Sequence, residues 1–169
     1  MKRIIFCVIA SLSILLPLQV VMAQSNSHRA NAIGKGYRGM VELQGVAMPV
    51  DGGPSNYGAL FTYHGYQVVP QFFVGAGVGV VADGFSAGDM LMSVRLRSDI
   101  LERKITPFVE ADLGGRVYNG SDSYGGRPRY FSAYGGCRFR IYKKLGVNVG
   151  LGYSFYHFGG VGLKVGIDF

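Results

Sequence analysis

An alternation of apolar with polar or small residues, at a period of two, recurs eight times along this chain. The alternating runs lie at 37–48, 57–68, 71–82, 89–98, 106–118, 130–142, 147–156 and 161–169. Successive side chains of a β-strand point to opposite faces, so each run predicts a strand with one apolar face. Eight such segments of about ten residues are typical of a transmembrane β-barrel, whose apolar faces meet lipid.

The amino-acid composition favours strands over helices. The chain has 27 Gly among 169 residues, and all of them follow residue 33. Gly inside a helix costs about 1 kcal/mol relative to Ala, which argues against an ordinary helical protein. The longest strictly apolar run beyond the N-terminal segment, at 72–82, is shorter than the roughly 20 residues of a spanning helix. We therefore predict an all-β fold, an eight-stranded antiparallel up-and-down transmembrane β-barrel over residues 36–169.

The first 23 residues have the pattern of a secretory signal peptide. Lys2 and Arg3 precede an almost wholly apolar run, Ile4–Val21, and a small-residue cleavage site ends at Ala23. The alternative is an uncleaved membrane anchor, but Pro17 interrupts the apolar run and the cleavage site follows it directly. We expect export, cleavage after residue 23, and a final location in the cell outer membrane.

Charge and cysteine content limit which partners and which disulfides we expect for the exported chain. Loss of the signal lowers the formal net charge from +7 to +5, and the basic residues are spread along the chain. Nucleic acid is therefore not an expected partner. Cys7 leaves with the signal, so Cys137 has no partner for an intramolecular disulfide. Residues 24–35 are polar and are expected to form a flexible N-terminal segment.

A soluble, lipocalin-like barrel with an apolar interior is the competing fold hypothesis. Its exterior would need many Lys, Glu and Asp, yet the second faces of two runs are mostly Gly and Ser. A face of Gly75, Gly77 and Gly79 is unusual in water, whereas inside a narrow lumen it would leave room for Arg. This favours the membrane barrel.

Aromatic residues near the ends of the runs are expected to form the interfacial girdles of such a barrel. These residues are Tyr57, Phe72, Phe108, Tyr118, Tyr130, Tyr142, Tyr153 and Phe155. An even number of strands places both termini on one side, where the short connections resemble periplasmic turns.

The segments 64–67 with Pro70, 72–79, 104–109 and 143–146 resemble hairpins of small outer-membrane β-barrel proteins of the Bacteroidota. These are porin-family barrels of eight strands, with the architecture of OmpA and OmpX. The chain ends in Phe169, and Val165, Ile167 and Phe169 share a face, resembling the signal read by the barrel-assembly machinery. The resemblance covers residues 36–169. It implies the outer-membrane lipid bilayer and the assembly machinery as partners, and it leaves activity and oligomeric state open.

Charged residues on the second faces are expected inside the barrel, with Gln44 and His64 as uncharged members. Seven are basic and four are acidic: Arg38, Glu42, Arg95, Arg97, Glu110, Asp112, Arg116, Arg138, Arg140, Lys164 and Asp168. Enclosed charges must be paired, so we expect a salt-bridged plug inside a structural or surface-binding scaffold. The excess of three positive charges leaves a narrow channel with anion preference as the alternative.

Catalysis needs a nucleophile, a base and an orienting group within hydrogen-bond reach. Some outer-membrane barrels of eight strands modify lipids with His and Ser, which makes such an enzyme the second alternative. Here Ser154 and His157 are three residues apart, so a continued strand would place them on opposite faces. Thr62 and His64 share a face that we expect to point inward. We predict no enzyme, no catalytic residue, no metal ligand and no cofactor.

Overall fold

The computed structural model describes residues 35–48, 55–83, 87–100, 103–118, 129–142, 145–156 and 159–169. These residues form eight strands: β1 (Gly36–Met48), β2 (Ser55–Val69), β3 (Phe72–Asp83), β4 (Ala87–Asp99), β5 (Ile105–Tyr118), β6 (Arg129–Tyr142), β7 (Leu145–Phe155) and β8 (Gly159–Asp168). The bounds of every strand lie within two residues of a predicted run. The expected signal peptide, all of the 24–35 segment except Lys35, and parts of the connections lie outside the described residues.

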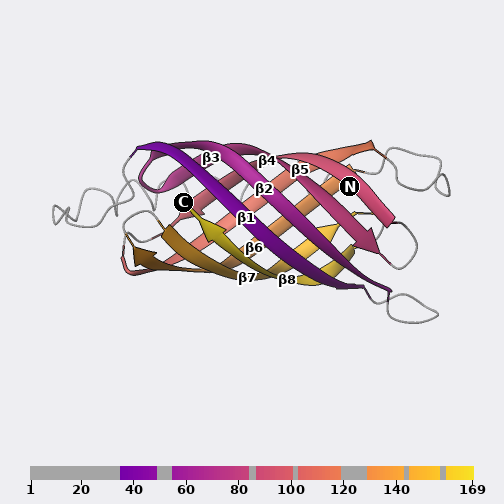
Figure 1. The fold of residues 1–169 in the computed structure, drawn as a ribbon. Coiled ribbons are helices and arrows are strands. Elements are labelled where there is room, and N and C mark those ends of the chain that lie inside the picture. The colour runs from indigo at the N-terminus through magenta and orange to yellow at the C-terminus, as the bar shows by residue number, and fades with distance from the viewer. Residues whose placement is uncertain are drawn as a thin grey trace, which may run out of the picture. The chain divides into compact units, whose positions relative to one another are not determined.

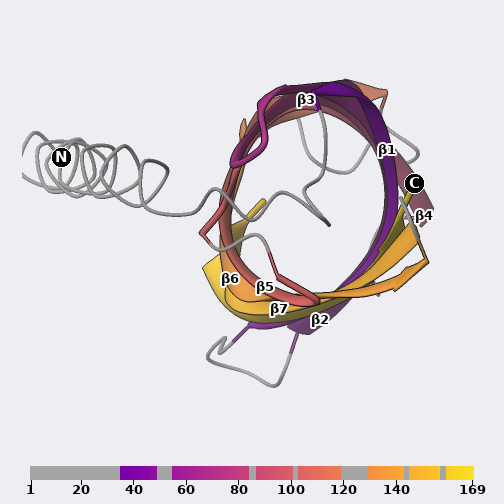
Figure 2. The same ribbon diagram turned by 90° about the vertical axis from the view of Figure 1, so that its left-hand side faces the viewer.

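The eight strands close into one antiparallel barrel. Each strand pairs with the next along the chain, and β8 pairs back onto β1. Figure 1 shows the strands running obliquely along the barrel, and Figure 2, turned by 90°, shows them closing into a ring. The predicted eight-stranded up-and-down barrel is confirmed. Within the described part of the chain, no helix is long and apolar enough to cross a membrane.

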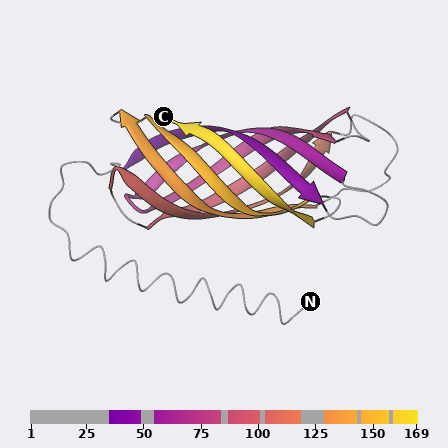
Figure 3. The same cartoon turned by 90° about the horizontal axis from the view of Figure 1, so that it is seen from below.

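The two terminal strands complete the barrel, with β8 beside β1 in Figure 3. Gly39 N–H donates to the Phe169 carbonyl at 2.8 Å, and Phe169 N–H donates to the Gly39 carbonyl at 2.9 Å. The Phe169 ring covers Gly39, since a Cβ added there would lie 2.6 Å from the ring edge. Because closure pairs the strand edges, no long edge is left open along these two strands.

Burial alternates along the strands in the sense opposite to that of a water-soluble barrel. Along β8, Lys164 is 1% exposed, whereas its neighbours Leu163 and Val165 are 54% and 45% exposed. The same pattern holds on β4, where Arg95 is enclosed between the exposed residues Val94 and Leu96. The barrel therefore presents an apolar outer belt and encloses its charged side chains.

Three of the expected girdle aromatics lie inside the barrel instead. Tyr57, Phe108 and Tyr130 are almost completely buried, whereas Tyr153 and Phe155 face outward as expected. The inward rings have room because glycines lie beside them: a Cβ added to Gly150 would lie 3.3 Å from the Phe108 ring. The girdle assignment was wrong for these three residues because it used position along the strand and ignored which face each residue occupies.

Candidate functional site

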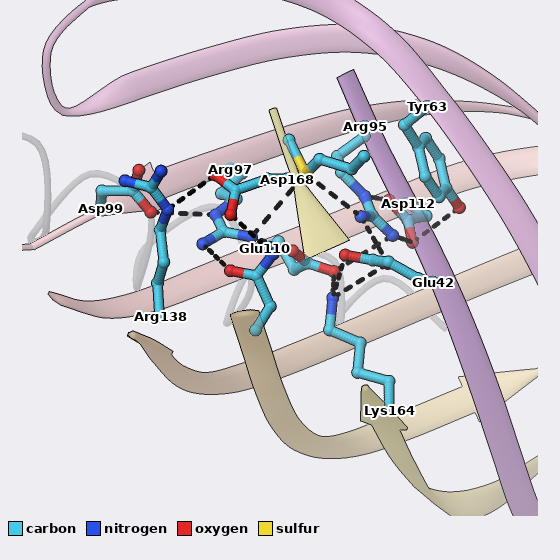
Figure 4. Close-up of polar contacts among 12 residues, drawn as sticks. Glu42, Tyr63, Arg95, Arg97, Asp99, Glu110, Asp112, Arg138, Lys164 and Asp168 are labelled. Atoms are coloured by element: carbon cyan, nitrogen blue, oxygen red, sulfur yellow. Dashed lines mark hydrogen bonds and ion pairs between the residues drawn. The ribbon is translucent and has the colours of Figure 1, made fainter. Parts of the chain in front are cut away.

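The filled interior of the barrel is the candidate functional site, because it holds the charged residues singled out from the sequence. Inward positions of five strands carry Arg38, Glu42, Arg95, Arg97, Glu110, Asp112, Arg116, Arg138, Arg140, Lys164 and Asp168. Arg116 and Arg140 are partly exposed, and the other nine are buried. Figure 4 shows most of these side chains converging from opposite walls of the barrel.

Arg95 is the centre of the largest cluster. Its guanidinium contacts Glu42 on β1 (Nη1–Oε2, 2.6 Å), Glu110 on β5 (Nη2–Oε1, 3.1 Å) and Asp112 on β5 (Nε–Oδ1, 2.7 Å). Lys164 on β8 forms ion pairs with Glu42 and Glu110. Two cations thus face three carboxylates from four strands, and this cross-links the walls of the barrel.

The Tyr63 ring packs against the guanidinium group of Arg95 in the central cluster. The Arg95 guanidinium carbon lies 3.5 Å from the centre of this ring, a cation–π distance. A Cβ added to Gly77 would meet the Tyr63 ring and lie 2.7 Å from the Thr62 carbonyl oxygen. The inward glycines of β3 therefore make room for aromatic rings, and Arg stacks on one of them. Direct accommodation of Arg, the expected role of this stripe, is not what the structure shows.

A second cluster lies toward the end of the barrel where β1 begins and β8 ends. Arg38 bridges Asp99 (Nη1–Oδ2, 2.8 Å) and Asp168 (Nη2–Oδ2, 2.9 Å). Arg97 contacts Asp99 at 2.9 Å, and Arg138 contacts Asp168 at 2.6 Å. Three guanidinium groups therefore share two carboxylates at this level, and Arg97 also donates to the Asn148 side chain.

The opposite end of the interior is mostly aromatic and apolar. Tyr57 donates to the Ser154 hydroxyl at 2.7 Å, and the ring centres of Phe61 and Tyr130 are 5.3 Å apart. Arg116 pairs with Asp89 at 3.4 Å, and the Tyr156 hydroxyl also donates to Asp89. Burial raises the pKa of the Tyr156 phenol, which lies just beyond β7 and stays protonated as a donor.

The enclosed charges are closer to balance than the sequence analysis expected. Asp89 and Asp99 point inward and bring the acidic residues to six, against seven basic ones, among the described residues. Both aspartates have the same parity as Arg95 and Arg97 on β4, so extending that alternation would have found them. The expected excess of three positive charges is therefore wrong, and one remains. Arg140 has two buried nitrogens without a hydrogen-bond partner.

The side chains of the central cluster have almost no contact with solvent. Arg95 and Asp112 have no exposed surface, and Glu42, Lys164 and Glu110 are at most 5% exposed. Residues that line an aqueous pore keep contact with water, whereas an eight-stranded barrel is just wide enough for side chains to fill. At this level the barrel is closed by its own side chains.

Of the two candidate catalytic residues near the end of β7, the structure describes only Ser154. Its hydroxyl is buried and accepts a hydrogen bond from Tyr57, and His157 lies outside the described residues. His64 faces outward together with Thr62, so its expected interior position is wrong. On β2 the large rings of Phe61 and Tyr63 occupy the inward face, which leaves the smaller polar residues outside. In the described part of the chain, no three His, Cys, Asp or Glu side chains are grouped to hold a metal ion.

Comparisons with known proteins identify the architecture. No family model and no curated protein match the chain. Neisserial surface protein A (NspA) superposes with a TM-score of 0.61 at 11% identity, covering 80% of this chain and 97% of that one. The N-terminal β-barrel domain of Pseudomonas aeruginosa OprF superposes with a TM-score of 0.51 at 18% identity, covering 77% and 97%. At such identities the shared feature is the fold, a small barrel of the outer-membrane type.

Proposed function

We propose that this chain is an integral outer-membrane protein whose closed barrel acts as a structural or surface-binding scaffold. The observation that carries this proposal is the inverted distribution of side chains. Leu43, Leu113, Leu151 and Ile141 are each more than 60% exposed on the outer face, while the ion pairs lie inside. Apolar patches of this extent are unfavourable in water and favourable against acyl chains.

The filled interior supports a scaffold over a channel. Opening a path past Arg95 would require separating its ion pairs with Glu42 and Asp112, and isolated enclosed charges cost several kcal/mol each. The near balance of the enclosed charges gives no support to the alternative of anion preference. The purified protein in planar bilayers is therefore expected to show no steady conductance, with a large porin as the positive control. Steady single-channel openings would contradict the scaffold.

We infer that the chain reaches the membrane through its two ends. Residues 1–23 direct export and are removed, and the C-terminal strand is read by the barrel-assembly machinery. In support, Val165, Ile167 and Phe169 are about half exposed on one outer face of the barrel. The variant Phe169→Ser is expected to lower the assembled, heat-modifiable fraction in cells several-fold. The same variant should still fold from urea into detergent, which separates recognition from folding.

We also propose that the chain belongs to the small Bacteroidota outer-membrane barrels. Membership of the small Bacteroidota outer-membrane barrels rests on the hairpin sequences and on the terminal Phe169.

A lipid-modifying enzyme is the less favoured function, because Ser154 is enclosed and hydrogen-bonded to Tyr57. Lipid A mass spectra with and without the gene test this directly. Unchanged spectra are expected, and loss or gain of an acyl chain would establish an enzyme.

A further inference from the structure

Arg140, near the end of β6, has no counter-charge in the described part of the chain. It shares the inward parity of Arg138, whose guanidinium pairs with Asp168 at 2.6 Å. Each of the other six inward basic residues of the described ranges forms an ion pair with a carboxylate. With seven basic and six acidic inward residues, the one positive charge in excess therefore lies at Arg140.

The side chain of Arg140 presents an unfilled fork of two N–H groups. Its Nε and Nη2 are both buried and have no hydrogen-bond partner. These two nitrogens form one edge of the planar guanidinium, and their N–H groups are parallel. Arg95 uses the same edge for Asp112, with Nε–Oδ1 at 2.7 Å and Nη2–Oδ2 at 2.8 Å. The Arg140 fork therefore has the form of a site for a group with two anionic oxygens.

The groups nearest to the Arg140 fork add positive charge. A Cβ added to Gly146, which pairs with Arg140 in the sheet, would lie 2.7 Å from Nε of Arg138. The Arg138 side chain therefore reaches the level of Arg140. Asp99 and Asp168, the described carboxylates at this end, each already pair with two other guanidinium groups. A further anion would thus meet an excess of positive charge.

The Arg140 fork lies near the end of the barrel where β6 ends. Arg140 N–H donates to the Lys104 carbonyl at 2.9 Å, and the side chains of Arg103 and Lys104 are exposed. Arg140 itself is partly exposed, and Tyr142, two residues further on, is 65% exposed. Every acidic residue whose burial the structure describes is enclosed. This rim therefore attracts anions from solution, and no exposed carboxylate of the described ranges competes for them.

We propose that the Arg140 fork binds an anion that presents two oxygens, a phosphate or a carboxylate group, at this end of the barrel. Two parallel N–H···O bonds satisfy Nε and Nη2, and the negative charge offsets the one positive charge in excess. Arg138, Arg103 and Lys104 strengthen the attraction. The site lies at the mouth and needs no conduction through the barrel, so this inference goes beyond the proposed scaffold and does not depend on it.

The first test measures the binding of inorganic phosphate to the full exported protein. Isothermal titration calorimetry is carried out in a maltoside detergent, which has no phosphate or carboxylate, and at low ionic strength, where screening is weak. The variant Arg140→Gln is expected to weaken binding about tenfold or more, because a hydrogen-bonded charge pair is lost. The matched control Arg129→Gln removes an exposed guanidinium at the other end of the same strand and should leave binding unchanged.

The variant Arg140→Lys separates the fork from the charge. Lysine keeps the positive charge but has no planar pair of N–H groups. We expect it to bind phosphate more weakly than the wild-type protein and more tightly than Arg140→Gln. A ligand that binds only the folded protein stabilises it. Phosphate should therefore raise the temperature at which the wild-type protein changes its gel mobility and should not raise that of Arg140→Gln.

Two further titrations identify the source of the anion. Acetate presents a carboxylate, and dihexanoyl phosphatidylglycerol presents the phosphate of a lipid headgroup. Tighter binding of inorganic phosphate or acetate than of the lipid assigns the site to a soluble anion. Tighter binding of the lipid assigns it to a headgroup at the membrane surface. Either order supports the site, provided that Arg140→Gln abolishes the binding.

Three results would overturn this inference. The first is that the wild-type protein binds none of the three anions, and the second is that Arg140→Gln binds them equally well. The third is binding that appears only after Glu102→Gln, because the fork would then belong to a carboxylate of this chain. Glu102 is in the connection before β5 and lies outside the described residues. None of these results would change the proposed membrane insertion or the scaffold.

Discussion

At the scale of single residues, Arg95 holds the interior together. Its planar guanidinium forms ion pairs with three carboxylates from two strands and stacks on the Tyr63 ring. Enclosed ion pairs add stability only when both charges are hydrogen-bonded. Arg95 and Asp112 meet this condition, because Nε and Nη2 donate to the two carboxylate oxygens at 2.7 and 2.8 Å.

We predict that Arg95→Ala destabilises the barrel by about 3–5 kcal/mol, because three enclosed carboxylates lose their main counter-charge. Urea unfolding in detergent, followed by tyrosine fluorescence and gel mobility, measures the change. The matched control Arg129→Ala removes an exposed guanidinium at the start of β6 and should cost less than about 1 kcal/mol. Equal effects of the two variants would show that the central cluster is not stabilising.

The variant Arg95→Lys separates charge from geometry. Lysine keeps the positive charge but cannot bridge the carboxylates with a planar fork. We expect a loss of stability between those of the wild-type protein and Arg95→Ala. Wild-type stability of this variant, in the same unfolding assay, would mean that charge alone is sufficient.

At the scale of strands, the contact of β1 with β8 decides whether the barrel closes. Its last backbone bonds join Gly39 to Phe169, and the Phe169 ring lies over Gly39 on the outer face. A side chain at position 39 would have to displace this ring, because an added Cβ would lie 2.6 Å from its edge. Phe169, directly after β8, thus both bonds to the backbone of β1 and covers Gly39 with its ring.

We predict that Gly39→Val displaces the Phe169 ring and destabilises the barrel by about 1–3 kcal/mol, the usual cost of overpacking. The matched control is Gly45→Val on the same outer face of β1, where an added Cβ meets open space. The temperature at which each folded variant changes its gel mobility measures the difference. A lower transition for Gly45→Val than for Gly39→Val would contradict this role of the seam.

At the scale of the whole molecule, the apolar outer belt and the charged interior together determine whether the barrel is stable in water or in apolar surroundings. Aliphatic residues are exposed on all eight strands, while the ion pairs are shielded from water. A barrel with its charged side chains outside and its apolar side chains inside would be a soluble carrier. The direction in which the side chains point therefore decides in which cellular compartment the fold is stable.

We predict that the exported chain stays monodisperse in detergent micelles and aggregates when detergent is diluted below its micelle concentration. Light scattering together with circular dichroism measures size and strand content. A stable, β-structured and monodisperse protein in plain buffer would replace the membrane barrel with a soluble ligand carrier.

Much of the fold could be predicted from the sequence, because strand alternation is a local property. Side chains two residues apart share a face, so the eight runs and the inward side of β4 follow from parity alone. Parity failed on β2, where both faces carry polar or aromatic residues. There the outcome depended on space, because the glycines of β3 admit Phe61 and Tyr63 to the interior and leave His64 outside.

The sequence by itself determined the strands, the closed topology expected from their even number, and the enclosure of charge. Only the tertiary structure decided which charges meet. Arg38 and Asp168 are 130 residues apart, and Lys164 and Glu42 are 122 residues apart. These pairs depend on the register of every strand between them, summed around the barrel, and no local pattern carries that information. The same summation joins Phe169 to Gly39.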